Sequence, residues 1–128
     1  SERLSTLRGE TERRREICLR YLAEIRNPWL VLLEPPEEMN AHAFHLFVLR
    51  CEKREEVRSY LASQNIETLL HYPIPGHQQQ GLQEFLVDPY GLPFTERHAR
   101  TCLSIPCHPG LTDEQVAHII YHLNEFSL

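Results

Sequence analysis

The sequence contains no long apolar run, no closely paired cysteines and no surplus of basic residues. No apolar stretch approaches the roughly 20 residues that a helix needs to cross a bilayer, and no signal peptide is visible at the start. The formal net charge is -5, which argues against nucleic acid as the main partner, because phosphate binding requires clustered lysine and arginine. These absences favour a cytoplasmic protein with neither nucleic-acid nor membrane partners.

Cysteine is also scarce, and its spacing excludes the common metal and disulfide frameworks. The four cysteines are Cys18, Cys51, Cys102 and Cys107. They show neither the C-x-x-C spacing of zinc sites nor the density of a secreted disulfide scaffold, so we expect reduced thiols. A nucleophilic pair of Cys107 with His108 is disfavoured, because adjacent residues on an extended chain point in opposite directions.

Histidine is more frequent, with eight residues, but its pattern does not predict a metal site. His118 and His122 have the four-residue spacing of helical metal ligands, yet no H-E-x-x-H motif surrounds them. We interpret both as surface histidines. A zinc set that combines His71 and His108 with nearby cysteines matches no established spacing, so no metal is predicted.

Hydrophobic periodicity over the 128 residues predicts one α+β domain, a small sheet of three or four strands packed against helices. The expected helices are residues 2–26, 53–65, 96–102 and a final helix after 112, with a short helix over 78–86. The expected strands are 29–33, 42–50, 66–70 and 103–105. Strand 42–50 is apolar on both faces and is expected to be central and covered on both sides.

Local signals mark several boundaries of these elements. Asn65 is expected to end its helix in a left-handed conformation. Thr95 is the expected N-cap of helix 96–102, and Thr112 with Gln115 forms a predicted capping box. The sequence Asp88-Pro89-Tyr90-Gly91 predicts a turn.

The stretch 66–78 concentrates more usable chemistry than any other part of the chain. A short apolar run ends in His71-Tyr72, and the prolines and glycine that follow end the predicted strand. The loop then presents His77 and Gln78. Side chains at a strand end are well positioned for ligand binding, so these four residues are the candidate site. The alternative for His71, a ring bonded to a backbone carbonyl within a tight turn, stays open from the sequence.

Four motifs in order resemble the C-terminal part of the nucleotide-sugar aminotransferases of the DegT/DnrJ/EryC1/StrS type. They are HLFVLR at 45–50, NIETLLHYPIPGHQ at 65–78, LPFTERHA at 92–99 and LSIPCHPGLT at 103–112. The charged run at 12–15 also resembles the family's helix leading into the small domain. The resemblance implies a connector helix over 1–26 and a C-terminal small domain over 27–128 of a fold-type I enzyme.

The resemblance further implies that this chain is a fragment, because it opens without methionine and lacks the family's large domain. That domain carries the lysine that forms a Schiff base with pyridoxal phosphate. The one lysine here, Lys53, does not match its motif. We therefore expect no cofactor on this chain, no catalytic residue in it, and no transamination by it alone.

In the parent protein, the resemblance implies transfer of an amino group to a nucleotide-linked keto sugar, with glutamate as the expected donor and a homodimer as the working form. His71, Tyr72, His77 and Gln78 would line the substrate cleft, with a neutral imidazole bonding a sugar hydroxyl or a diphosphate oxygen. Two alternatives remain: a non-catalytic binding or interaction module, and a degenerate regulator with the same small-domain fold.

Overall fold

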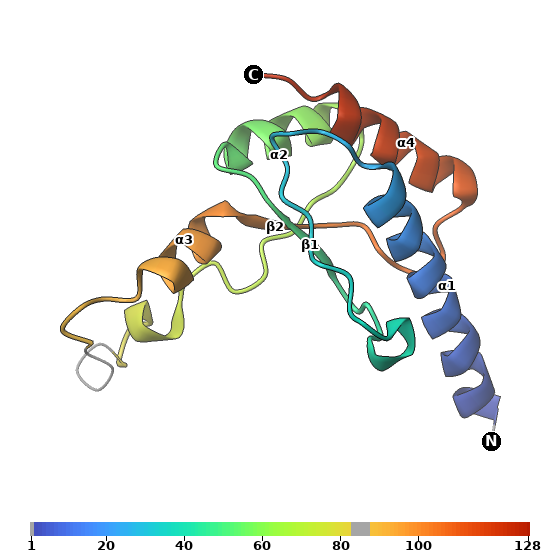
Figure 1. Ribbon diagram of the computed structural model, residues 1–128, viewed down its shortest axis with the longest axis horizontal. Helices are drawn as coiled ribbons and strands as arrows, with labels where there is room; N and C mark the ends of the chain where they lie inside the picture. Colours follow the sequence, from blue (N-terminus) through green and yellow to red (C-terminus); the bar gives the residue numbers. More distant parts are fainter. Residues whose placement is uncertain (1, 83–87) are drawn as a thin grey trace.

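The computed structural model describes residues 2–82 and 88–128, which form an α+β fold (Figure 1). The helices in these residues are α1 (Glu2–Glu24), α2 (Arg54–Ser63), α3 (Pro93–Thr101) and α4 (Asp113–Glu125), with 3-10 turns at Met39–Ala41 and Gly76–Gln78. The strands are β1 (Phe47–Arg50) and β2 (Cys102–Ile105). The expected long N-terminal helix is confirmed, and so is the brief strand before Pro106.

The sheet is smaller than the expected three or four strands. Strands β1 and β2 pair antiparallel, with Phe47 opposite Ile105 and Arg50 opposite Cys102. The other two predicted strands contribute one isolated antiparallel bridge each, Val31 to Arg50 and Leu69 to Ser104. All four predicted strand segments therefore hydrogen-bond with one another as members of one sheet would. Among the described residues, however, only two of them form strands of more than one residue.

The predicted strand 42–50 begins five residues late because the chain turns at Phe44. This residue is buried with a φ of 47°, a left-handed conformation that interrupts an extended strand. The His42 ring nitrogen Nδ1 accepts a hydrogen bond from the Phe44 amide at 2.9 Å and holds this turn. Within β1, Phe47 and Leu49 are buried while the other two residues are only half-buried, so the strand is covered fully on one face.

The apolar composition of residues 29–33 predicts a strand five residues long. That prediction is wrong in length, because the structure has only a single bridge there, at Val31. Trp29, Val31 and Leu33 are 50%, 49% and 39% exposed. Within the run 29–33, all of whose residues are described, Val31 alone hydrogen-bonds to β1, through its amide and carbonyl to Arg50 at 2.8 and 2.9 Å. Leu30 is 7% exposed and Leu32 is half-buried, so the run alternates in burial as a strand would, but it joins the sheet by one bridge alone among the described residues.

The helix predictions needed smaller corrections. Asn65 has a φ of 58°, which confirms the left-handed end after α2. Helix α3 begins at Pro93 rather than at 96, so Thr95 lies inside the first turn and is not the N-cap. Proline is favourable at a first helical position, where its missing N–H costs nothing. The turn at 88–91 is confirmed by the bond from the Gly91 amide to the Asp88 carbonyl at 3.1 Å.

The expected short helix over 78–86 falls partly outside the described residues. The described part is a 3-10 turn at Gly76–Gln78 followed by turns to residue 82, with no α-helix. Residues 83–87 are not among the described residues. None of the helices in the described parts of the chain combines the length and apolar character that crossing a membrane requires.

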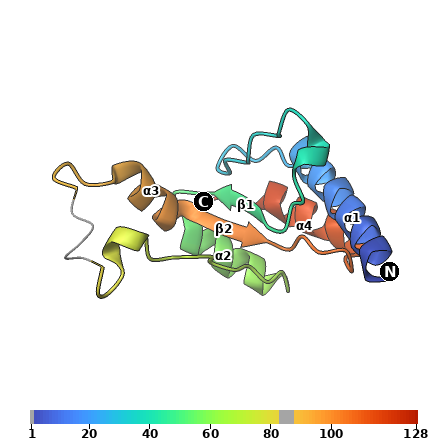
Figure 2. The same cartoon turned by 90° about the horizontal axis from the view of Figure 1, so that it is seen from below.

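The core lies where the two strands meet α1, α2 and α4. Helices α1 and α4 lie side by side at one end of the molecule, and α3 extends at the other end (Figure 1, Figure 2). Tyr21 of α1 is fully buried, and its ring meets Phe47 of β1 edge-on with centroids 5.0 Å apart. The apolar face predicted for the last helix is confirmed by the burial of Val116, Ile119, Ile120 and Leu123.

Helix α4 begins with the predicted capping box. The Thr112 hydroxyl oxygen accepts from the Gln115 amide at 3.2 Å, and the Gln115 side chain accepts from the Thr112 amide at 2.9 Å. This pair satisfies two N–H groups that the first turn leaves without helical partners.

We expect Thr112→Ala to lower the free energy of unfolding by about 1 kcal/mol, the usual cost of losing an N-cap side chain. Urea denaturation of the full chain measures this change. Thr95→Ala is the matched control and should change stability by less than about 0.5 kcal/mol, because Thr95 caps no helix. Equal losses in the two variants would contradict the assignment of the caps.

Candidate functional site

His71 occupies a fixed position at the end of the segment that bridges to β2. Just before it, Leu69 forms two backbone hydrogen bonds with Ser104, at 3.0 and 2.8 Å. Immediately after it, Tyr72 has a φ of 56°, so the chain turns sharply toward the proline-rich loop. The His71 backbone is thus held between a sheet contact and a turn, as the sequence predicted for a strand end.

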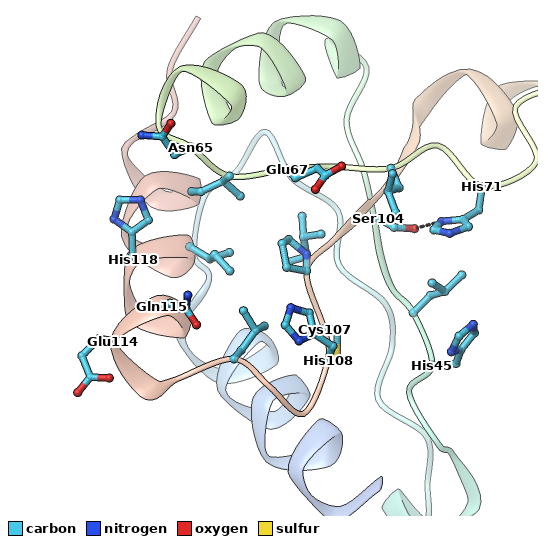
Figure 3. Close-up of a pocket in the computed structure, with 17 residues that line it drawn as sticks. His45, Asn65, Glu67, His71, Ser104, Cys107, His108, Glu114, Gln115 and His118 are labelled. Carbon is cyan, nitrogen blue, oxygen red and sulfur yellow. Dashed lines mark hydrogen bonds between the residues drawn. The ribbon is translucent and has the colours of Figure 1, made fainter. Parts of the chain in front are cut away.

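The His71 ring is held by a side chain of the sheet. Its Nδ1 lies 2.8 Å from the Oγ of Ser104, which is 5% exposed on β2 (Figure 3). The partner is a hydroxyl rather than the backbone carbonyl considered from the sequence. Among the described residues, no partner is recorded for the other ring nitrogen, Nε2. A half-buried imidazole with one nitrogen anchored and the other available is suited to binding a polar ligand.

The His71–Ser104 pair lies between two cavities, to which both residues contribute. The first, here called the α4 cavity, has a volume of about 540 Å³ and reaches α4 through Gln115, His118 and Ile119. Figure 3 shows its labelled polar residues on α4, on β2 and the loop after it, on the segment after α2 and on the segment before β1, with Glu114 turned outward. The further polar residues that line it are His45, Asn65, Glu67, His108 and Glu114.

The second cavity, here called the α3 cavity, has a volume of about 450 Å³. It lies between the loop that follows His71 and helix α3, with Tyr72 on one side and Thr95 and His98 on the other. Both cavities fall in the size range of small-molecule sites, and each combines an apolar wall with a few polar groups.

The structure separates the four residues predicted for the site into two groups. His71 and Tyr72 both line the α3 cavity, with the Tyr72 side chain 85% exposed at its rim. His77 lines neither cavity, and its Nε2 lies 3.2 Å from the Glu96 carboxylate of α3. Gln78 is exposed and also outside both linings. A role in substrate binding stays a prediction for all four.

Ser104 and Glu67 are potential site residues that sequence reasoning missed. Ser104 was placed in an apolar strand, and its polarity there was the signal that went unused, since a buried hydroxyl requires a partner. Glu67 lies two positions before Leu69 and faces the α4 cavity. Glu67 reaches this cavity only because of the path that the chain takes after α2, and hydrophobic periodicity does not predict that path.

The two histidines with metal-like spacing serve to hold helices together. His118 Nε2 lies 3.0 Å from the Gln64 carbonyl, and His122 Nδ1 lies 3.1 Å from the Tyr60 hydroxyl. These contacts join α4 to the end of α2. In the described parts of the chain, no group of three or more histidine, cysteine, aspartate or glutamate residues is arranged to hold a metal ion.

Comparison with known proteins gives matches along nearly the whole chain. The sequence model of the DegT/DnrJ/EryC1/StrS aminotransferase family matches residues 1–124. The chain is 38% identical over 126 residues to dTDP-3-amino-3,6-dideoxy-alpha-D-galactopyranose transaminase of Aneurinibacillus thermoaerophilus, covering 98% of this chain and 34% of that protein. It is 31% identical over 118 residues to the pleiotropic regulatory protein of Geobacillus stearothermophilus, covering 91% of this chain and 32% of that protein.

The fold agrees with these matches. The crystal structure of S. venezuelae DesV superposes with a TM-score of 0.86 at 32% identity, covering 96% of this chain and 33% of that one. The chain therefore spans about a third of the length of the proteins it matches.

Proposed function

Because the chain belongs to the DegT/DnrJ/EryC1/StrS aminotransferase family, we propose that it is the C-terminal small domain of a nucleotide-sugar aminotransferase. Residues 27–128 would be the domain, and residues 1–26, mostly α1, the connector to a large cofactor-binding domain. The observation that carries the proposal is the 38% identity to a dTDP-sugar transaminase over 98% of this chain. The parent would use pyridoxal phosphate, glutamate as amino donor and a keto sugar on a nucleotide, and would work as a homodimer.

The residues of this chain do not fit the cofactor itself. Lys53 is the one lysine in the sequence, and its side chain is 56% exposed and ion-paired with Glu56 at 3.6 Å. It lines neither the α4 cavity nor the α3 cavity. Pyridoxal phosphate supplies electron-sink chemistry where a lysine positions it. In this proposal that lysine belongs to the large domain, and the fragment alone is inactive.

The contribution of this chain would be one wall of the substrate cleft. The Ser104 hydroxyl fixes the His71 ring at Nδ1, at 2.8 Å, and leaves Nε2 to bond a sugar hydroxyl or a diphosphate oxygen. Tyr72, at the rim of the α3 cavity, offers an exposed phenol beside it. His77 and Gln78 would join the cleft from the following loop, where His77 is now paired with Glu96.

The proposed function is tested by assaying the full-length protein. Purified enzyme with pyridoxal phosphate and glutamate would be offered keto sugars linked to dTDP, UDP or GDP, with the amino sugar detected by mass spectrometry. We expect one nucleotide class to be converted, with release of 2-oxoglutarate. A folded protein that binds the cofactor and aminates none of the three classes would overturn the proposal.

A second test uses the 128-residue chain with equimolar pyridoxal phosphate followed by borohydride. We expect no specific adduct at Lys53, because its exposed side chain is ion-paired with Glu56 and lines neither cavity, so nothing there holds the cofactor. Peptide mapping after reduction measures the result, with the full-length enzyme as positive control. A stoichiometric adduct at Lys53 would contradict the assignment of the cofactor to the large domain.

The regulator alternative has one specific observation in its favour, the match to a protein named as a pleiotropic regulator. A non-catalytic binding or interaction module is the other alternative. The same assay separates both from the leading proposal, because neither would produce an amino sugar. The sequence preceding Ser1 separates them as well: a large domain with a Schiff-base lysine supports the enzyme.

A further inference from the structure

Two buried thiols from distant parts of the chain are in contact. The Sγ of Cys18, on α1, lies 3.4 Å from the Sγ of Cys107, in the segment that follows β2. Both cysteines are free thiols, 89 residues apart in the sequence. A disulfide requires about 2.05 Å between the sulfurs, so a combined movement of roughly 1.4 Å would bring the pair to bonding distance.

The contact is fixed by bonds on both sides of it. One turn after Cys18, the Tyr21 hydroxyl donates to the carbonyl of Pro106, the residue before Cys107, at 2.7 Å. Five residues before Cys18, the Arg13 guanidinium donates to the Leu111 carbonyl at 2.9 Å. These bonds hold α1 against the segment that carries Cys107. The packing of the fold therefore keeps the two sulfurs in contact.

The two sulfurs differ in access. Cys107 lines the α4 cavity (Figure 3) and is 8% exposed. Cys18 is completely buried and is not part of that lining. A small oxidant entering the cavity therefore meets Cys107 first. Cys18 is already in contact with it and is the sulfur placed to resolve the oxidised product.

The pKa values of the two thiols also make Cys107 the more reactive of the pair. The hydrogen bond with Cys18 lowers the pKa of Cys107, burial opposes this, and the positive charge of Arg14 adds to the lowering. The same hydrogen bond, together with burial, raises the pKa of Cys18. Since the thiolate is the nucleophile, this asymmetry favours initial attack by Cys107.

We propose that Cys18 and Cys107 form a redox modification site, in which hydrogen peroxide converts the thiol pair into a disulfide. The Cys107 sulfur attacks one peroxide oxygen and becomes a sulfenic acid, with release of one water. The Cys18 thiol then attacks the Cys107 sulfur, forming the S–S bond and releasing the hydroxyl group with its own proton as a second water. Two thiols are oxidised and one peroxide is reduced. The inference does not depend on the proposed function.

The disulfide would tie α1 covalently to the wall of the α4 cavity, next to His108. A link across 89 residues removes much of the freedom of the unfolded chain. We expect the oxidised protein to unfold at a temperature higher by on the order of 10 °C than the reduced form. Reduction by dithiothreitol should reverse the shift.

The test treats the intact full-length protein with hydrogen peroxide, removes the peroxide with catalase, and alkylates the remaining thiols under denaturing conditions. Peptide mapping without reductant should show Cys18 linked to Cys107, with Cys51 and Cys102 alkylated. Cys51→Ser is the matched control, since Cys51 is also a buried cysteine, and should keep the link. Cys18→Ser should leave Cys107 as a sulfenic acid that dimedone captures.

Mapping of the unmutated protein keeps the test valid even where a variant fails to fold. Links that involve Cys51 or Cys102 would overturn the proposal. So would oxidation of Cys107 to sulfinic or sulfonic acid without a link, or recovery of all four thiols unchanged.

Discussion

Replacing His71 by alanine in the full-length enzyme is expected to lower kcat/KM for the nucleotide sugar by about 10- to 100-fold, as loss of one hydrogen bond to a charged or strongly polar group does. The fold holds the His71 imidazole between the Ser104 hydroxyl and the turn at Tyr72. Because the cofactor belongs to other residues in the proposed parent, its absorbance should persist. Steady-state kinetics and the visible spectrum measure the two effects separately.

Two amide replacements sharpen this experiment. His71→Asn places an amide near the position of Nδ1, where it keeps the Ser104 contact but does not reach the cavity. His71→Gln extends an amide to the position of Nε2. We expect glutamine to recover more activity than asparagine if Nε2 contacts the substrate. Unchanged kinetics in the alanine variant would remove His71 from the site.

His77→Ala provides the comparison within the same loop. Its ring is bonded to Glu96 and lies outside both cavities, so its loss should be smaller than that of His71. An equal loss would mean that the loop changes its contacts when the large domain and substrate are in place.

Replacing Asn27 by alanine should lower the free energy of unfolding by about 3–5 kcal/mol, because the change leaves three polar backbone groups without partners. Asn27 is 7% exposed where the chain leaves α1. Its Nδ2 donates to the carbonyls of Leu123 and Phe126, both at 2.7 Å, and its Oδ1 accepts from the Trp29 amide at 2.9 Å. One side chain thus fastens the end of α1 to the end of α4.

Denaturant unfolding of the chain measures this loss, which is a large part of the usual 5–15 kcal/mol of a small domain. Asn40→Ala is the control, since Asn40 is exposed and, among the described residues, only its backbone carbonyl is hydrogen-bonded, to Arg15; it should change stability by less than about 0.5 kcal/mol. A loss below about 1 kcal/mol for Asn27→Ala would show that water replaces the amide at this position.

Much of the local structure followed from short-range signals. The Thr112 capping box, the left-handed Asn65 and the turn at 88–91 were all predicted correctly, because each depends on residues within a few positions of one another. The sheet was overestimated because strand formation depends on a distant partner. The run 29–33 is apolar and Leu30 packs into the core, but among the described residues only Val31 of this run forms a bridge to another strand.

The candidate site divides in the same way. The sequence alone determined the family resemblance, the fixed position of His71 at the end of its segment, and the presence of a single lysine, Lys53. Tertiary structure decided that Ser104, 33 residues away, holds the His71 ring, that Glu96 takes the His77 ring out of the cavities, and that Cys18 meets Cys107. The physical reason is one of range: turns, caps and motifs are encoded by neighbouring residues, whereas these side-chain pairs exist only once α1, β2 and α3 have packed into place.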